Sequence, residues 1–128
     1  MRIILASKSG VRKKILDDHN ISSKVVVSNV DEDEIKNSLL QEGATPDVIS
    51  KNLAEIKSIK VSSKEPDELV LGADSVISLN NKLINKPKSR DEAFKILKKL
   101  NGSKHYLISS VCISKNGAMI WNYTDSSE

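Results

Sequence analysis

Asp74 is the residue whose type and position most clearly predict chemistry in this sequence. It directly follows the apolar run of residues 69–73, where an unpaired carboxylate would carry a desolvation cost of several kcal/mol. Its carboxylate must therefore reach a metal ion, a hydrogen-bond network or solvent. We expect Asp74 at the C-terminal end of a strand, where α/β sheets place ligands. A structural carboxylate that caps a turn explains the same pattern.

The Ser-Lys-Ser-Gly segment of residues 7–10 is a second candidate site. A small-residue turn between a strand and a helix presents free backbone N–H groups to an anion. Ser7 and Ser9 add hydroxyl donors, and Arg12 and Lys13 add positive charge. The sequence holds neither G-x-x-x-x-G-K-[ST] nor G-x-G-x-x-G, and a basic first helical turn is more often simply solvated. Anion binding and a solvated helix face therefore both fit.

Four consecutive carboxylates, Asp31 to Glu34, stand before an apolar-periodic stretch. Acidic residues in the first turn of a helix interact favourably with the helix dipole, so a solvated helix start explains them, and a metal or substrate role needs further support. Lys86 lies in a proline-stiffened loop one hairpin after Asp74 and could approach the same edge, although loop lysines are usually solvated.

The histidines and the cysteine argue against two classes of enzyme. We expect His19 and His105 on the surface or at the edge of the core rather than as general bases. Cys112 lies in an apolar strand pattern, which predicts an inert buried thiol. The sequence thus argues against serine-hydrolase and thiol chemistry. A single cysteine also excludes an intramolecular disulfide and a multi-cysteine zinc site.

The composition is that of one ordinary globular domain: 128 residues, 38% hydrophobic and 29% charged. No apolar run approaches the roughly 18 residues that a spanning helix needs, so we expect a cytoplasmic protein without a membrane partner. A net charge of +3 and 3% aromatic residues argue against a nucleic-acid partner.

Alternating periodicities predict a mixed-sheet α/β domain. We expect strands over 2–6, 24–30, 69–73, 75–79, 82–84, 106–114 and 118–123, with turns at 80–81 and 115–117. We expect helices after Ser9, after the acidic run, from Pro46 to about Ser62, and from Ser89 to Asn101-Gly102. The third helix should bury Ile49, Leu53 and Ile56, and the fourth should present an apolar stripe of Ala93, Ile96, Leu97 and Leu100.

Six short motifs occur in a fixed order along the chain. They are Leu5-Ala6-Ser7-Lys8-Ser9 with Arg12-Lys13 and Ile15-Leu16; Val30-Asp31-Glu32; Leu53-Ala54-Glu55-Ile56-Lys57; Leu71-Gly72-Ala73-Asp74-Ser75-Val76; Lys86-Pro87; and Leu100-Asn101-Gly102 with His105. In this order and spacing the chain resembles the Maf family of nucleoside triphosphate pyrophosphatases. The resemblance covers essentially the whole sequence.

The resemblance implies the α/β fold shared with inosine triphosphate pyrophosphatases, in which a mixed twisted sheet with flanking helices lines a cleft. It also implies hydrolysis of a nucleoside triphosphate to the monophosphate and pyrophosphate, with Mg²⁺ or Mn²⁺. Asp74 matches the family's general base or metal ligand, and Glu32 matches a glutamate near the metal. The expected substrate-binding residues are Ser7, Ser9, Arg12, Lys13, Lys57 and Lys86. A homodimer is a further implication of the family.

Some positions depart from the family pattern. Proline and a large or basic residue are common where this chain has Gly10 and Val11, and the second place is linked to nucleobase preference. With Val11 and Ser75 at these positions, the preferred nucleobase could be a pyrimidine or a modified purine. The Gly-Lys-Pro of many members is Asn-Lys-Pro at 85–87. Because family members run longer, through a Gly-rich segment, we expect residues 1–128 to be a single Maf-like domain that is incomplete at its C-terminus.

Two other functions stay open. A truncated, catalytically impaired member of the same fold would bind nucleotide or a partner without turnover. A small basic nucleic-acid-binding module is the other, and the scarcity of aromatic residues argues against it.

Overall fold

A computed structural model of the chain describes residues 3–7, 10–79, 82–84, 89–100 and 105–127. Within these residues it contains six strands and four helices. The strands are β1 (Ile3–Leu5), β2 (Ser23–Val25), β3 (Leu69–Leu79), β4 (Lys82–Ile84), β5 (His105–Lys115) and β6 (Ala118–Ser127). The helices are α1 (Gly10–Asp18), α2 (Glu32–Gln41), α3 (Pro46–Ser62) and α4 (Arg90–Leu100). None of these helices is long and apolar enough to cross a membrane.

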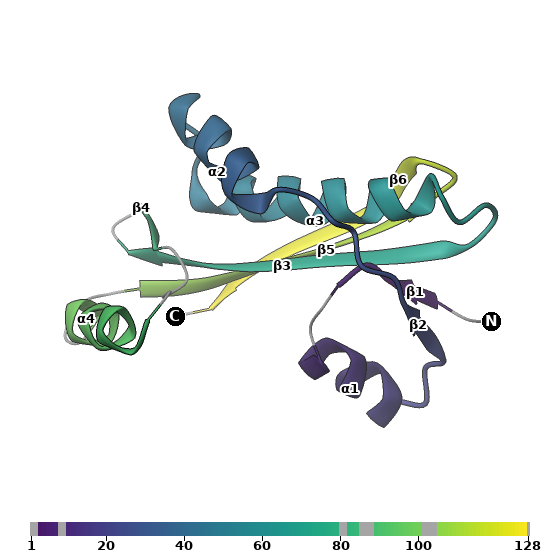
Figure 1. Cartoon of the computed structure of the whole chain (residues 1–128), viewed down its shortest axis with the longest axis horizontal. Helices are drawn as coiled ribbons and strands as arrows, with labels where there is room; N and C mark the ends of the chain where they lie inside the picture. The colour runs from purple at the N-terminus through teal and green to yellow at the C-terminus, as the bar shows by residue number, and fades with distance from the viewer. Residues whose placement is uncertain (1–2, 8–9, 80–81, 85–88, 101–104, 128) are drawn as a thin grey trace.

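The strands form one mixed sheet in the order β2-β1-β3-β5-β6, with β4 also paired to β3. β1 pairs in parallel with β2 and β3, and the other pairings are antiparallel. Figure 1 shows the long strands β3, β5 and β6 as one twisted layer, with α3 along one face and α1 beside β1 and β2 on the other side. The predicted mixed-sheet α/β architecture is confirmed.

β3 is one continuous strand, so the predicted strand end at Asp74 is wrong. Its partner β5 pairs with it from Val70 to Leu79 without interruption, which places Asp74 in the middle of the strand. Alternate β3 residues face opposite sides of the sheet. Asp74 lies on the side that carries α3, where the side chain can be buried against the helix without breaking the strand.

The edge of β3 that faces away from β5 is paired only at its two ends. β1 pairs with residues 69–71 and β4 pairs with residues 77–79. Among the described residues, 72–76 therefore have no strand partner on this edge, and we call this stretch the edge gap. Asp74 lies at its centre. Asp74 lies in the middle of its own strand but beyond the carboxyl end of the neighbouring strand β1, which pairs with residues 69–71. Open α/β sheets bind ligands at the carboxyl ends of their parallel strands.

The core lies between α3 and the sheet. Ile49 and Leu53 of α3 are fully buried, as predicted, whereas Ile56 is only half-buried. Gly72 of β3 permits a close approach of α3, because a Cβ at this position would lie 2.4 Å from the carbonyl oxygen of Ala54. Pro46 occupies the predicted first turn of α3, after Thr45 at the N-cap position.

Cys112 is fully buried on the same side of the sheet. Burial raises the pKa of its thiol to about 11, which confirms the predicted inert thiol.

Two strands differ by several residues from their predicted extents. β2 ends at Val25 instead of Val30, because its partner β1 ends at Leu5 and the last bond between them runs from Val26 N to Leu5 O. β6 continues beyond the predicted end at residue 123, because β5 supplies partners as far as Leu107. Of the apolar residues predicted along α4, Ala93, Ile96 and Leu100 are half-buried and Leu97 is 67% exposed.

The turn between β5 and β6 is confirmed, with positive φ angles of 52° at Asn116 and 82° at Gly117. The predicted turn at residues 80–81 and the helix end at 101–102 lie outside the described residues.

Candidate functional site

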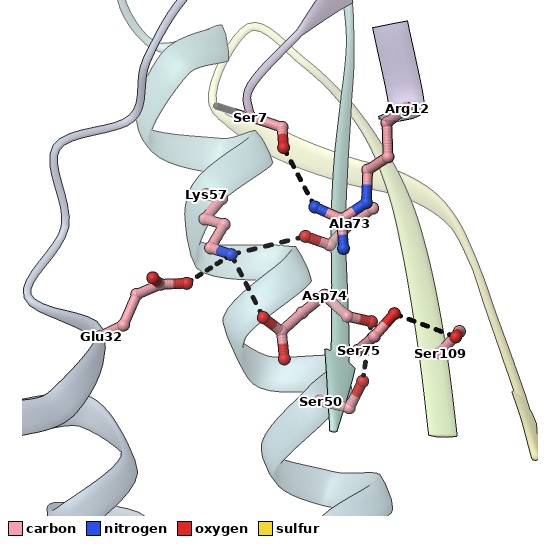
Figure 2. A network of polar contacts seen from close by, with 9 residues as sticks. All are labelled: Ser7, Arg12, Glu32, Ser50, Lys57, Ala73, Asp74, Ser75 and Ser109. Carbon is pink, nitrogen blue, oxygen red and sulfur yellow. Dashed lines mark hydrogen bonds and ion pairs between the residues drawn. The ribbon is translucent and has the colours of Figure 1, made fainter. Parts of the chain in front are cut away.

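Lys57 joins two carboxylates that come from different elements. Its Nζ lies 3.2 Å from Asp74 Oδ1 of β3 and forms an ion pair with the Glu32 carboxylate of α2. It also approaches the carbonyl oxygen of Ala73 at 3.5 Å. Figure 2 shows the Lys57 side chain reaching from α3 toward the edge of β3, with Glu32 on its far side. Lys57 and Asp74 are both buried, so this pair acts where water screens charge weakly.

The carboxyl group of Asp74 has a raised pKa. Burial is the largest cause and outweighs the charge and hydrogen bond of Lys57, which lower the pKa. Lys36 also lowers it and Glu32 raises it. Asp74 Oδ2 is buried and has no hydrogen-bond partner among the described residues. One oxygen is therefore held by Lys57 while the other is available to a ligand.

Local contacts at the start of α2 place Glu32. Asp31 is the N-cap residue, and its Oδ1 accepts a hydrogen bond from Glu34 N at 3.1 Å. The loop before it is tied to α3, because Lys60 Nζ donates to the carbonyl oxygen of Asn29 at 2.7 Å. The four carboxylates thus separate: Asp31 caps the helix, Glu32 reaches Lys57, and the remaining two are exposed. The capping interpretation is confirmed for Asp31, and the metal or substrate role stays a prediction for Glu32.

Ser7 and Arg12 lie together beside the edge gap. Arg12 Nη1 donates to Ser7 Oγ at 3.0 Å, which ties α1 to the residue just after β1. Figure 2 shows the Arg12 side chain reaching toward Ser7 beside Ala73 of β3. Two of the four residues predicted to bind an anion, Ser7 and Arg12, therefore lie together at the end of β1.

A pocket of about 260 Å³ opens on the α1 side of the sheet. Its walls combine apolar side chains of α1, β3 and β5 with a few polar groups. The lining residues are Arg12, Ile15, Leu16, Leu71, Ala73, Asp74, Ser75, Ser109, Ser110 and Val111. The Ser75 and Ser109 hydroxyls are 3.0 Å apart in this lining. An apolar pocket with a small number of fixed polar groups is typical of a small-molecule site.

Lys13 is not among these residues, although it is the neighbour of Arg12. Its Nζ donates to Asp17 Oδ1 at 3.0 Å and to the carbonyl oxygen and Oγ of Ser23 at 2.9 Å each. Ser9 and Lys86 lie outside the described residues, and Val11 lies in α1 without a described side chain. The structure thus joins Glu32 and Asp74 through Lys57 and joins Arg12 to Ser7. Arg12, Asp74 and Ser75 line the same pocket.

Two residues near the site were not found from the sequence. Ser109 lies opposite Ser75 in the β3–β5 register, and Ser50 of α3 donates its hydroxyl to the carbonyl oxygen of Asp74 at 3.1 Å. Serine carries no periodic signal of its own. Only the strand register could have indicated Ser109, and only the docking of α3 could have indicated Ser50.

The donor set around Asp74 fits a divalent cation. Magnesium is commonly held by one or two carboxylates, with phosphate oxygens and water completing its shell. Asp74 has a buried Oδ2 without a hydrogen-bond partner among the described residues, and Glu32 reaches the same ammonium group as Asp74. The described part of the chain contains no group of three histidine, cysteine or acidic residues able to hold a metal unaided. The residues therefore fit a cation shared with a phosphate ligand.

Comparison with known proteins gives the family. The family described as Maf-like protein matches residues 2–128. The chain belongs to this Maf-like family. A nucleoside triphosphate pyrophosphatase of Pelagibacter ubique is 65% identical over 96% of this chain and 63% of its own length. A 7-methyl-GTP pyrophosphatase of Brucella abortus is 33% identical over 96% of this chain and 62% of its own length. The chain thus spans a little over three fifths of these Maf-like relatives.

Solved structures support the fold of this Maf-like chain. A HAM1 protein from Coxiella burnetii matches with a TM-score of 0.59 and 14% sequence identity, over 100% of this chain and 72% of that chain. At this identity the likeness shows the fold alone. The family predicted from six short motifs is confirmed, and so is the predicted fold.

Proposed function

We propose that this chain carries the catalytic groups of a nucleoside triphosphate pyrophosphatase, which converts a nucleoside triphosphate and water to the monophosphate and pyrophosphate. The observation that carries the proposal is the state of Asp74. Its carboxylate is buried, has a raised pKa and is held on one oxygen by Lys57, while the buried Oδ2 has no hydrogen-bond partner among the described residues. The Maf-like relative from Pelagibacter ubique, named for this activity, is 65% identical.

In the proposed reaction Asp74 is the general base. Its Oδ2 accepts a proton from the attacking water, whose oxygen bonds to the α-phosphorus as the bond to the pyrophosphate oxygen breaks. A raised pKa suits this role, because a base is most effective when its pKa approaches the working pH. Lys57 fixes the orientation of the carboxylate through Oδ1. Arg12, beside Ser7, binds phosphate oxygens as a charge-assisted donor.

We propose that Glu32 and Asp74 hold Mg²⁺ or Mn²⁺ together with substrate oxygens. When bound, the cation supplies charge neutralisation to the triphosphate and the leaving pyrophosphate. Lys57 lies between the same two carboxylates and keeps them close before the substrate arrives.

The nucleobase is proposed to lie in the pocket on the α1 side, where Ser75 contributes a hydroxyl. Val11 and Ser75 are the proposed specificity positions. Lys57 keeps its proposed substrate-binding role, in which a phosphate oxygen would replace one of the three present partners of its ammonium group. Ser9 and Lys86 also keep their proposed substrate-binding roles. A homodimer, a cytoplasmic location and the absence of nucleic-acid binding stay predictions.

Nucleotide binding without hydrolysis is a second candidate function. The observation that favours it is the pocket, whose apolar walls and Arg12 side chain do not depend on Asp74 acting as a base. In that case Arg12, Lys57 and the pocket would still hold a nucleotide.

Pyrophosphate release from a panel of nucleoside triphosphates, including 7-methyl-GTP, tests the proposal. We expect activity in the wild type and a loss of about 10²–10⁴-fold in Asp74→Asn, as for removal of a general base. Asp33→Asn is the matched control, because Asp33 is an exposed carboxylate at the start of the same helix as Glu32. Binding by calorimetry without pyrophosphate release would favour the second function. Neither binding nor release with any nucleotide contradicts both.

A further inference from the structure

Lys13 and Arg12 are neighbours in α1, but their side chains serve different parts of the molecule. Arg12 lines the pocket and donates to Ser7. One residue turns an α-helix by about 100°, so the next side chain faces another direction. Lys13 faces β2, where Ser23 lies.

The ammonium group of Lys13 has a complete set of protein partners. A lysine ammonium carries three hydrogens to donate. Three oxygens lie within hydrogen-bond distance: Asp17 Oδ1 at 3.0 Å, Ser23 O at 2.9 Å and Ser23 Oγ at 2.9 Å. A phosphate oxygen would have to displace one of these partners. Arg12, in contrast, has a guanidinium group with five donors and faces the pocket.

The hydrogen bonds from Lys13 to Ser23 are important for the position of α1, because apolar packing alone holds this helix weakly. Ile15 and Leu16, which point toward the sheet, line the pocket instead of filling a core, and Ile15 is 51% exposed. The Lys13 contacts with Ser23 join the middle of α1 to β2, and β2 is paired with β1. These contacts therefore set how far α1 stands from the sheet, and with it the position of Arg12.

We propose that Lys13 is a positioning residue that ties α1 to Ser23, holds Arg12 at the pocket and contacts no phosphate. This inference rests on the proposed function for the ligand that Arg12 binds, but the tie between Lys13 and Ser23 does not depend on any ligand. It assigns different roles to two adjacent basic residues that the sequence presents as a pair.

Calorimetry with inorganic tripolyphosphate tests this proposal, because the probe has no base. Single variants Lys13→Met, Ser23→Ala and Arg12→Ala are compared with Lys14→Met, a control at the adjacent exposed lysine. We expect Arg12→Ala to weaken binding about tenfold or more. Lys13→Met should weaken binding in the wild type but add less than about twofold in the Arg12→Ala background. Ser23→Ala should act in the same direction as Lys13→Met, by a smaller factor because the Ser23 carbonyl remains.

The opposite pattern overturns the proposal. A direct phosphate ligand would give factors that multiply when Lys13→Met is combined with Arg12→Ala, and Ser23→Ala would leave binding unchanged or tighter by releasing the ammonium. Lys14→Met should match the wild type, and an equal loss there would mean that general surface charge explains the effect and would also overturn it.

A second measurement is independent of ligand. Urea unfolding of Lys13→Met, Ser23→Ala and the double variant should show coupling, with the double variant less destabilised than the sum of the two. Strict additivity contradicts the tie. If the wild type binds neither tripolyphosphate nor any nucleotide, the proposed function is wrong, and the tie between Lys13 and Ser23 is accepted or rejected on this coupling alone.

Discussion

Lys57 Nζ lies 3.2 Å from Asp74 Oδ1, and yet the pKa of Asp74 is raised above its ordinary value of 3.8. An adjacent ammonium group normally lowers the pKa of a carboxyl group. Here the burial of Asp74 outweighs that effect, and Glu32, which shares the same ammonium group, also raises the pKa. The folded protein therefore binds a proton at Asp74 more tightly than the unfolded chain does.

The raised pKa predicts how stability varies with pH. A raised carboxyl pKa contributes stability that is present below the unfolded value of 3.8 and is lost as pH rises through the folded pKa. As pH rises above this unfolded value we therefore expect the wild type to lose free energy of unfolding relative to Asp74→Asn. Urea unfolding in EDTA from acidic to neutral pH measures the difference, with Asp33→Asn as the matched control for loss of one exposed carboxylate. If the free energy of unfolding of the wild type instead increases relative to that of Asp74→Asn as pH rises, the pKa of Asp74 is not raised.

A divalent cation should stabilise the fold through Glu32 and Asp74. A ligand that binds only the folded state adds about 2.7 kcal/mol at one hundred times its dissociation constant. We expect Mg²⁺ to raise the melting temperature of the wild type, and to do so much less in Glu32→Gln and Asp74→Asn. Thermal unfolding with and without Mg²⁺ gives this result without any measurement of activity. Equal shifts in the wild type and both variants would place the cation elsewhere.

Gly72→Ala should separate α3 from the sheet. The new Cβ would lie 2.4 Å from Ala54 O and 2.8 Å from Ser58 Cβ, so the helix carrying Lys57 must move away from Asp74. We expect a loss of about 1–3 kcal/mol in the free energy of unfolding, together with reduced pyrophosphate release. Gly10→Ala is the matched control, because no heavy atom lies within 4 Å of a Cβ at that position. Similar stability in the two variants would mean that the close approach of α3 is unimportant.

Asp31→Ala should loosen the start of α2. Its carboxylate accepts from Glu34 N, and removal of an N-cap acceptor costs about 1 kcal/mol. Asp33→Ala removes an equal charge from the same helix turn without this bond, so the difference between the two variants isolates the cap. Urea unfolding measures the stability, and steady-state kinetics should show a higher KM for Asp31→Ala alone, because Glu32 follows the cap. Identical results for both variants would assign the effect to charge only.

Features set by neighbouring residues were predictable from the sequence. The start of α3 at Pro46 depends on a local N-cap and proline pattern, and the Asn116-Gly117 turn depends on two residues that tolerate positive φ. The motifs around Asp74 and Lys57 were sufficient to give the family.

Features set by distant contacts were not predictable. β3 continues through Asp74 because Lys57 of α3 compensates the buried carboxylate, while Glu32 of α2 shares the same ammonium group, and no local pattern shows these pairings. In the sequence, Arg12 and Lys13 are one pair of basic residues. Their different contacts, Arg12 with Ser7 and Lys13 with Ser23 of β2, follow from where β2 lies in the fold. The apolar stripe of α4 was identified from the spacing of its residues, but spacing alone does not show how far each residue is buried, and Leu97 is 67% exposed.

The parallel pairing of β1 with β3 has a kinetic consequence. These strands are separated in the chain by α1, β2, α2 and α3, whereas β5 and β6 are joined by a two-residue turn. Hairpins close within microseconds. Pairings between distant segments are slower, because the entropy of closing the loop is lost before any stabilising contact forms. The edge gap exists only after β1 has paired with residues 69–71. During refolding, the capacity to bind a ligand at Asp74 would therefore be acquired late, after the hairpin and most of the helical signal have already returned.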